Sequence, residues 1–105
     1  GYDHCFAVDG YEKNILKEVG QLRCQATGRK VTVLSSQPAA VLYTGNWLSG
    51  GCPKTKSDKY YQDYAGVAIE CQGFSDAVNH PDFPSIYLKA DELYCNKIVF
   101  KLEQF

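Results

Sequence analysis

The sequence of 105 residues contains no methionine, no Cys-x-x-Cys pair and no apolar run long enough to span a bilayer. It opens without a signal-peptide pattern, so a secreted protein is expected here in its mature form. Because no ligand residues stand at metal-site spacing, no metal or other cofactor is expected. A net charge of -1 excludes global attraction to a polyanion, so any contact with nucleic acid must rest on a local patch.

Five cysteines stand at long intervals, at Cys5, Cys24, Cys52, Cys71 and Cys95. A chain of this length forms one domain, residues 1–105, whose core is small enough that an added constraint would stabilise it. We interpret the cysteines as disulfides of a secreted protein rather than as metal ligands. The protein is expected to be a monomer that does not bind membranes. Because the number of cysteines is odd, at least one thiol remains unpaired in that monomer.

Residues 9–28 predict a helix. Their apolar side chains recur at steps of three and four, which places them on one stripe: Tyr11, Ile15, Val19, Leu22 and Ala26. Asp9 can cap the first turn, and Gly28 is suited to the left-handed stop. Cys24 lies near the edge of the stripe, where it could tether the helix to a sheet.

The rest of the chain predicts strands and loops. Short β-branched or alternating stretches predict strands at residues 30–34, 39–44, 60–72, 85–89 and 94–102. Two irregular stretches, 45–59 and 73–84, contain glycine and proline and are expected to be functional loops. The predicted fold class is therefore α+β, with one N-terminal helix packed on a mainly antiparallel sheet of about five strands.

This layout resembles the fungal guanyl-specific extracellular ribonucleases and, more closely, the ribonuclease-like secreted effectors of cereal powdery mildew fungi. The resemblance is carried by the single helix and by short anchors: the opening YDHC, the step from Gln37 to Ala39, the pair Tyr60 and Tyr61, and the late Cys95. It implies a disulfide-stabilised, microbial-ribonuclease-like fold in which Cys5 pairs with Cys95. Cys24 could then reach Cys71 on the central strand or Cys52 in the loop.

The ribonuclease chemistry can be checked against these anchors. Cleaving RNA through a cyclic phosphate requires a base, an acid and a cation against the phosphate. In the family, as the resemblance implies, a histidine follows a Tyr-Pro step, a glutamate follows the tyrosine pair, and a second histidine lies on a late strand. Here these positions hold Ala39 and Gln62, and residues 85–105 contain no histidine. The resemblance therefore implies a pseudo-ribonuclease that is not an enzyme, with the vacant positions around one groove.

One stretch interleaves cations with aromatic rings, a combination that can follow a phosphate backbone and stack bases. The candidate RNA or partner contacts are Trp47, Lys54, Lys56, Lys59, Tyr60 and Tyr64. In the alternative interpretation, which the slightly acidic chain favours, the lysines keep a long loop soluble and the tyrosines pack on the sheet. Trp47, in the same loop, is either a lid over the core or an exposed partner contact.

The leading hypothesis is a secreted fungal virulence effector, delivered into host plant cells, that binds host RNA or ribonucleoprotein. The resemblance also implies recognition by a plant immune receptor as an avirulence protein. Two alternatives remain open. One is an active secreted ribonuclease that uses His80, Asp82 or Asp63. The other is a small disulfide-bonded inhibitor or antimicrobial protein.

Overall fold

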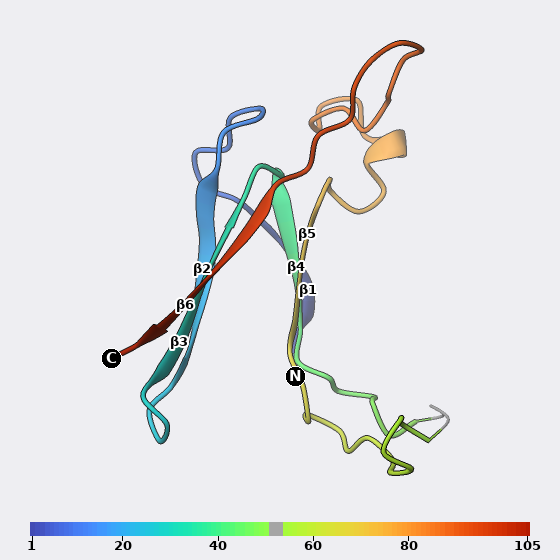
Figure 1. The fold of residues 1–105 in the computed structure, drawn as a ribbon. Coiled ribbons are helices and arrows are strands. Elements are labelled where there is room, and N and C mark those ends of the chain that lie inside the picture. The colour runs from blue at the N-terminus through green and yellow to red at the C-terminus, as the bar shows by residue number, and fades with distance from the viewer. Residues whose placement is uncertain (51–53) are drawn as a thin grey trace.

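The computed structural model describes residues 1–50 and 54–105 of the chain. It contains two antiparallel sheets of three strands each, in the orders β1-β4-β5 and β2-β3-β6 (Figure 1). The elements are β1 (Asp3–Ala7), β2 (Lys17–Cys24), β3 (Arg29–Ser35), β4 (Ala39–Tyr43), β5 (Ala68–Gln72), the short 3-10 helix η1 (Ala77–Asn79) and β6 (Ile98–Gln104). The described part of the chain contains no α-helix. The predicted α+β fold with an N-terminal helix is therefore wrong.

The segment predicted as a helix forms a turn-rich loop followed by β2. Leu22 of β2 pairs with Val31 of β3, and Cys24 pairs with Arg29, so the two strands form a hairpin. Gly28 does adopt a left-handed conformation, with φ of 62°, but it closes this hairpin instead of ending a helix. The neighbouring β-branched strand offers a ladder of backbone hydrogen bonds, and this pairing overrides the three-and-four spacing of the apolar residues.

The structure confirms some of the other predicted strands and contradicts others. Strands at residues 30–34 and 39–44 are confirmed as β3 and β4, whereas residues 85–89 form no strand. Only the last part of the predicted strand 60–72 is β5, because the preceding residues turn, with Tyr64 at φ of 61°. The last strand begins at Ile98 and not at residue 94.

The predicted disulfides are not present in the structure. Cys5, Cys24, Cys71 and Cys95 are all free thiols, and Cys52 lies outside the described residues. Cys24 lies at the end of β2 and Cys71 lies in β5, so they belong to different sheets. The proposed tether rested on a helix lying over the strand of Cys71, and that helix does not form.

The buried residues concentrate on the two consecutive strands β3 and β4. Val33 and Ser35 of β3 are each 1% exposed, and Ala39 of β4 is fully buried. The link between these strands is short, and the two sheets meet near it and diverge away from it (Figure 1). Small side chains at this meeting point let the two backbones approach closely. Long connections extend from the two ends of the β1-β4-β5 sheet (Figure 1). None of the described residues forms a helix long and apolar enough to cross a membrane.

Candidate functional site

The residues predicted to contact RNA or a partner lie in the long connection between β4 and β5. Lys54, Lys56, Lys59, Tyr60 and Tyr64 occupy irregular chain there, and Lys54 Nζ lies 2.9 Å from Oδ1 of Asp58. Trp47 is 78% exposed, so it does not cover the core. The tyrosines are exposed and do not pack on a sheet, contrary to the more conservative interpretation. The structure thus keeps this patch on one connection, beyond the end of the sheet.

The positions compared with ribonuclease catalytic residues do not share a groove. Ala39 is fully buried in β4, whereas Gln62 lies in the β4–β5 connection. Asp63 accepts hydrogen bonds of 2.8 Å from the backbone N–H and from the hydroxyl of Ser49, and these lower the pKa of its carboxyl. His80 Nε2 lies 3.3 Å from Oδ2 of Asp76 at η1. Asp63 and His80 therefore each interact with a residue of their own connection.

A different set of residues gathers on one face of the β1-β4-β5 sheet. Residues paired directly across antiparallel strands point to the same face. The registers place three rows on this face: Asp3, Tyr43 and Ala68; Cys5, Val41 and Glu70; and Ala7, Ala39 and Gln72. We call these nine residues the Glu70 face.

Glu70 occupies the middle row of this face and is exposed to solvent. Its direct neighbour Val41 offers no polar group, and no described side chain forms an ion pair or hydrogen bond with the Glu70 carboxylate. Asp3, on the same face, also has no side-chain partner among the described residues. Unpaired carboxylates on an open face are available to hydrogen-bond a ligand or to accept its proton.

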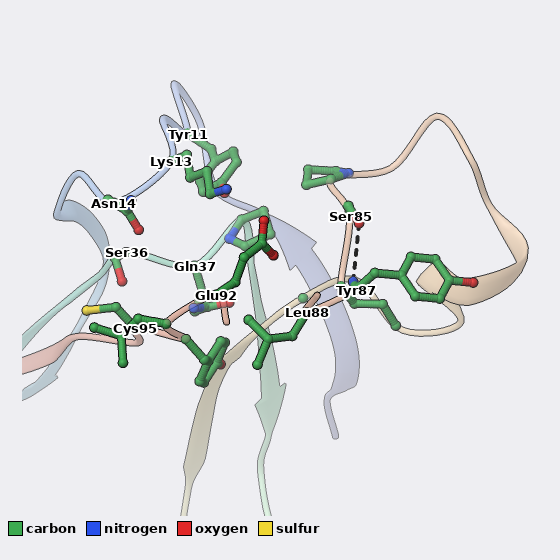
Figure 2. A pocket seen from close by; sticks show the side chains of 16 residues that line it. Tyr11, Lys13, Asn14, Ser36, Gln37, Ser85, Tyr87, Leu88, Glu92 and Cys95 are labelled. Carbon is green, nitrogen blue, oxygen red and sulfur yellow. Dashed lines mark hydrogen bonds between the residues drawn. The ribbon is translucent and has the colours of Figure 1, made fainter. Parts of the chain in front are cut away.

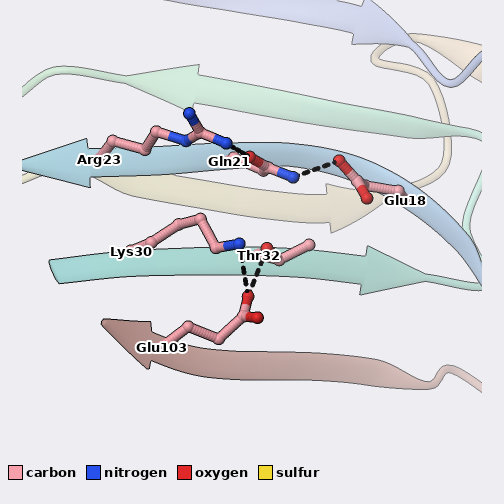
Figure 3. A network of polar contacts seen from close by, with 6 residues as sticks. All are labelled: Glu18, Gln21, Arg23, Lys30, Thr32 and Glu103. Atoms are coloured by element: carbon pink, nitrogen blue, oxygen red, sulfur yellow. Dashed lines mark hydrogen bonds and ion pairs between the residues drawn. The ribbon is translucent and has the colours of Figure 1, made fainter. Parts of the chain in front are cut away.

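On the β2-β3-β6 sheet, by contrast, several charged side chains have bonding partners (Figure 3). Lys30 Nζ lies 2.9 Å from Oε2 of Glu103, and the Thr32 hydroxyl donates to the same oxygen at 3.3 Å. The hydrogen bond from Lys30 is the main cause that lowers the pKa of Glu103. On the adjacent strand, Arg23 donates to Gln21, whose amide donates to Glu18. Lys30, Glu103, Arg23 and Glu18 are thus each bonded to a neighbouring side chain.

A cavity of about 650 Å³ lies at the end of the Glu70 face (Figure 2). Three segments distant in sequence form its walls. They are the β1–β2 loop, the β3–β4 link, and the chain that follows β5. Gln37 and Gly73, which flank the Ala39↔Gln72 row, contribute to it. The described residues contain no cluster of three or more His, Cys, Asp or Glu side chains able to hold a metal ion. The geometry thus places a cavity at the end of a face that carries unpaired carboxylates.

Comparison with known proteins identifies the origin of this arrangement. The aldose 1-epimerase family matches residues 1–101. This chain belongs to the aldose 1-epimerase family. The match runs from before Asp3 to within β6, so it includes the whole Glu70 face and the cavity.

Curated relatives agree with the family match. Galactose mutarotase of Rattus norvegicus is 38% identical over 101 residues, which are 96% of this chain and 29% of the relative. The human galactose mutarotase is 37% identical over 102 residues, with the same shares. Aldose 1-epimerase of Haemophilus influenzae is 36% identical over 83 residues, 79% of this chain and 23% of the relative. The chain therefore spans less than a third of the length of these relatives.

The family match corrects the functional predictions. The resemblance to ribonuclease-like effectors was wrong, and so were the conclusions drawn from it, a virulence effector and a pseudo-ribonuclease without enzymatic function. The predicted partners, host RNA and an immune receptor, and the predicted delivery into plant cells followed from that resemblance and lose this support. The predicted secretion rested on the expected disulfides, which are absent among the described residues. The anchors misled because each is a short run of residues that also occurs in an unrelated sheet protein.

The sequence analysis predicted a strand through Glu70 but gave this residue no role. A signal was available, since residues 67–71 contain a single carboxylate among apolar residues. That signal is weak, because an exposed glutamate on a strand is usually only a solvated side chain. The register with β1 and β4, which brings Asp3 to the same face, is what distinguishes Glu70.

Proposed function

We propose that this chain takes part in the interconversion of the α and β anomers of an aldose, with Glu70 as the catalytic base. The observation that carries the proposal is the unpaired carboxylate at the centre of the Glu70 face, in a chain that belongs to the aldose 1-epimerase family. Several relatives are named galactose mutarotases, so galactose is the first substrate to test.

The reaction needs proton transfers at two oxygens. Glu70 accepts the proton of the anomeric hydroxyl, and the bond between the anomeric carbon and the ring oxygen breaks. The electron pair of that bond passes to the ring oxygen, which takes up a proton from water. Rotation about the first carbon–carbon bond of the open aldehyde, followed by the reverse steps, gives the other anomer. Such proton transfer typically contributes about 100- to 10,000-fold to a rate.

The Glu70 face suits a polyhydroxylated substrate for a further reason. Asp3 and Gln72 place a second carboxylate and a side-chain amide around Glu70, and both accept hydrogen bonds from hydroxyl groups. Cys5, in the same row as Glu70, has a small and exposed side chain, which leaves room for a sugar ring to approach the carboxylate. His4 and His80 do not supply the second proton here, since His4 points to the opposite face of the sheet and His80 lies at η1.

The test compares Glu70→Gln with the unsubstituted protein. The exchange between α- and β-galactose is followed by polarimetry or by magnetisation transfer in proton NMR. We expect the variant to lose at least about 100-fold in kcat, because glutamine is close in shape to glutamate but cannot accept the proton.

The matched control is Glu18→Gln, which makes the same chemical change on the other sheet. It should exchange the anomers at the unsubstituted rate. Equal rates in Glu70→Gln and the unsubstituted protein would exclude Glu70 as the base.

A further inference from the structure

One face of the β2-β3-β6 sheet is apolar and open to water. Residues paired directly across antiparallel strands share a face, and so do residues two apart along a strand. The registers therefore place four apolar side chains on this face: Leu22 of β2, and Ile98, Phe100 and Leu102 of β6. Phe100 is 58% exposed and Leu102 is 78% exposed. We call these four residues the Phe100 face.

The opposite face of the same sheet is polar. It carries the ion pair of Lys30 and Glu103 and the hydrogen-bonded side chains of Arg23 and Glu18 (Figure 3). A sheet with one polar and one apolar face is typical of one layer of a sandwich, in which two apolar faces pack against each other. The β1-β4-β5 sheet does not supply the second layer here, because the two sheets diverge away from the β3–β4 link (Figure 1).

The chain as a whole exposes more surface than a compact domain of its size. A folded monomer of 11.7 kDa exposes roughly 5,900 Å² of accessible surface, whereas this chain exposes 7998 Å². Its radius of gyration is 16.4 Å, compared with about 13 Å for a compact domain of 105 residues. The excess of roughly 2,000 Å² per chain corresponds to one side of an obligate interface, in which two partners together bury about 2,000–5,000 Å².

A second copy of this chain fits the Phe100 face. Oligomers of identical chains are most often two-fold dimers, in which the same patch of both copies packs on itself. An apolar patch is complementary to itself without matched charges, and the net charge of -1 causes little repulsion between two copies. The Glu70 face belongs to the other sheet, so it takes no part in this contact.

We propose that two copies of this chain form a two-fold dimer in which the Phe100 faces of their β2-β3-β6 sheets pack as the two layers of a sandwich. The contact buries Phe100 and Leu102, the most exposed members of the face. The dimer replaces the monomer expected from the sequence. It is independent of the proposed function, because it does not involve Glu70.

The test measures the mass of the purified protein by sedimentation equilibrium over a range of concentrations. We expect a species of twice the chain mass of 11.7 kDa. Leu102→Lys places an ammonium group in the apolar contact of both copies, so we expect it to raise the Kd of the dimer at least about 100-fold.

Leu93→Lys is the matched control. It makes the same change at a leucine that is 92% exposed and lies outside both sheets, so it should dimerise like the unsubstituted protein. Far-UV circular dichroism of both variants shows whether the sheets are retained. A monomer at every concentration of the unsubstituted protein, or a dimer that Leu102→Lys leaves intact, would overturn the proposal.

A second measurement needs no variant. Isotope-labelled and unlabelled copies of the unsubstituted protein are mixed, and contacts between copies are detected by isotope-filtered NMR. We expect contacts from the Phe100 ring of one copy to the methyl groups of Leu22 and Leu102 of the other. Contacts between copies at other surfaces only would overturn the proposal. So would contacts of the Phe100 face with the β1-β4-β5 sheet of the same copy, because the chain would then cover its own face.

A different occupant is tested by coexpression with the part of the galactose mutarotase of Rattus norvegicus that this chain does not match. We expect the dimer of this chain to persist. A complex of one copy of each polypeptide, with no dimer left, would show that the Phe100 face takes that polypeptide and would overturn the proposal.

Discussion

On the β2-β3-β6 sheet Lys30 and Glu103 form an ion pair, whereas on the β1-β4-β5 sheet the carboxylates of Asp3 and Glu70 have no partner among the described residues. Glu70 and Glu103 both lie exposed on strands. They differ in the residue across the strand, which is Val41 for Glu70 and Lys30 for Glu103. A single neighbouring position thus separates a carboxylate that supports structure from one that can react.

The two sheets also differ in the turns that close them. Gly45 follows β4 with φ of 72°, and a Cβ there would lie 2.7 Å from the carbonyl oxygen of Gly66. Gly28 closes the β2–β3 hairpin with φ of 62°, and its Cβ would lie 3.0 Å from the carbonyl oxygen of Phe105, near the chain end. We expect Gly45→Ala to lower the free energy of unfolding by about 3 kcal/mol and Gly28→Ala by about 1–2 kcal/mol. Urea denaturation of both variants measures the difference.

Equal losses in the two glycine variants would show that the left-handed conformation alone determines the cost. A larger loss in Gly28→Ala would contradict the argument, because the carbonyl beside Gly45 belongs to a chain held at both ends.

The difference between the Glu70 and Glu103 carboxylates can be removed by placing a cation beside Glu70. Val41→Lys places an ammonium directly across the strand, at the short spacing of cross-strand pairs, where it can form an ion pair with Glu70. We expect galactose anomer exchange to slow by about tenfold, because the paired carboxylate accepts a proton less readily. Initial rates from polarimetry provide the measurement.

Val41→Met is the control, since it adds length without charge and should exchange the anomers nearly as fast as the unsubstituted protein. If both variants were equally slow, bulk on the Glu70 face and not the ion pair would explain the loss.

The smallest effect is expected at Glu103. Lys30 holds the pKa of this carboxyl below its ordinary value of 4.5, so its contribution to stability is present above that value and is lost as the pH falls through the lowered pKa. Glu103→Gln removes the contribution. The variant should therefore lose less stability than the unsubstituted protein between pH 7 and pH 3, as measured by urea denaturation at both values.

Glu18→Gln is the control for this pH dependence, because Glu18 accepts from the neutral amide of Gln21. Its loss of stability on acidification should equal that of the unsubstituted protein. The same behaviour in Glu103→Gln would mean that Lys30 does not stabilise the fold through this pair.

The local sequence determined those features of this protein that depend only on neighbouring residues. The β-branched and apolar runs of β3 and β4 predict strands wherever the sheet forms, and the alternation through Cys71 fixes which side of β5 is buried. Gly28 is read correctly as left-handed, since only its own backbone decides that conformation. Which element the turn at Gly28 ends, however, depends on the strands beside it, and here the turn closes the β2–β3 hairpin.

The tertiary structure decided the features that depend on residues far apart in the sequence. Residues 17–24 satisfy a helical spacing, and they become a strand because β3 lies beside them with an open edge. The candidate site likewise needs Asp3 from the start of the chain, Val41 from its middle and Glu70 beyond a long connection. Only strand register brings these side chains to one face, because side-chain direction follows pairing and pairing is not written in any single segment.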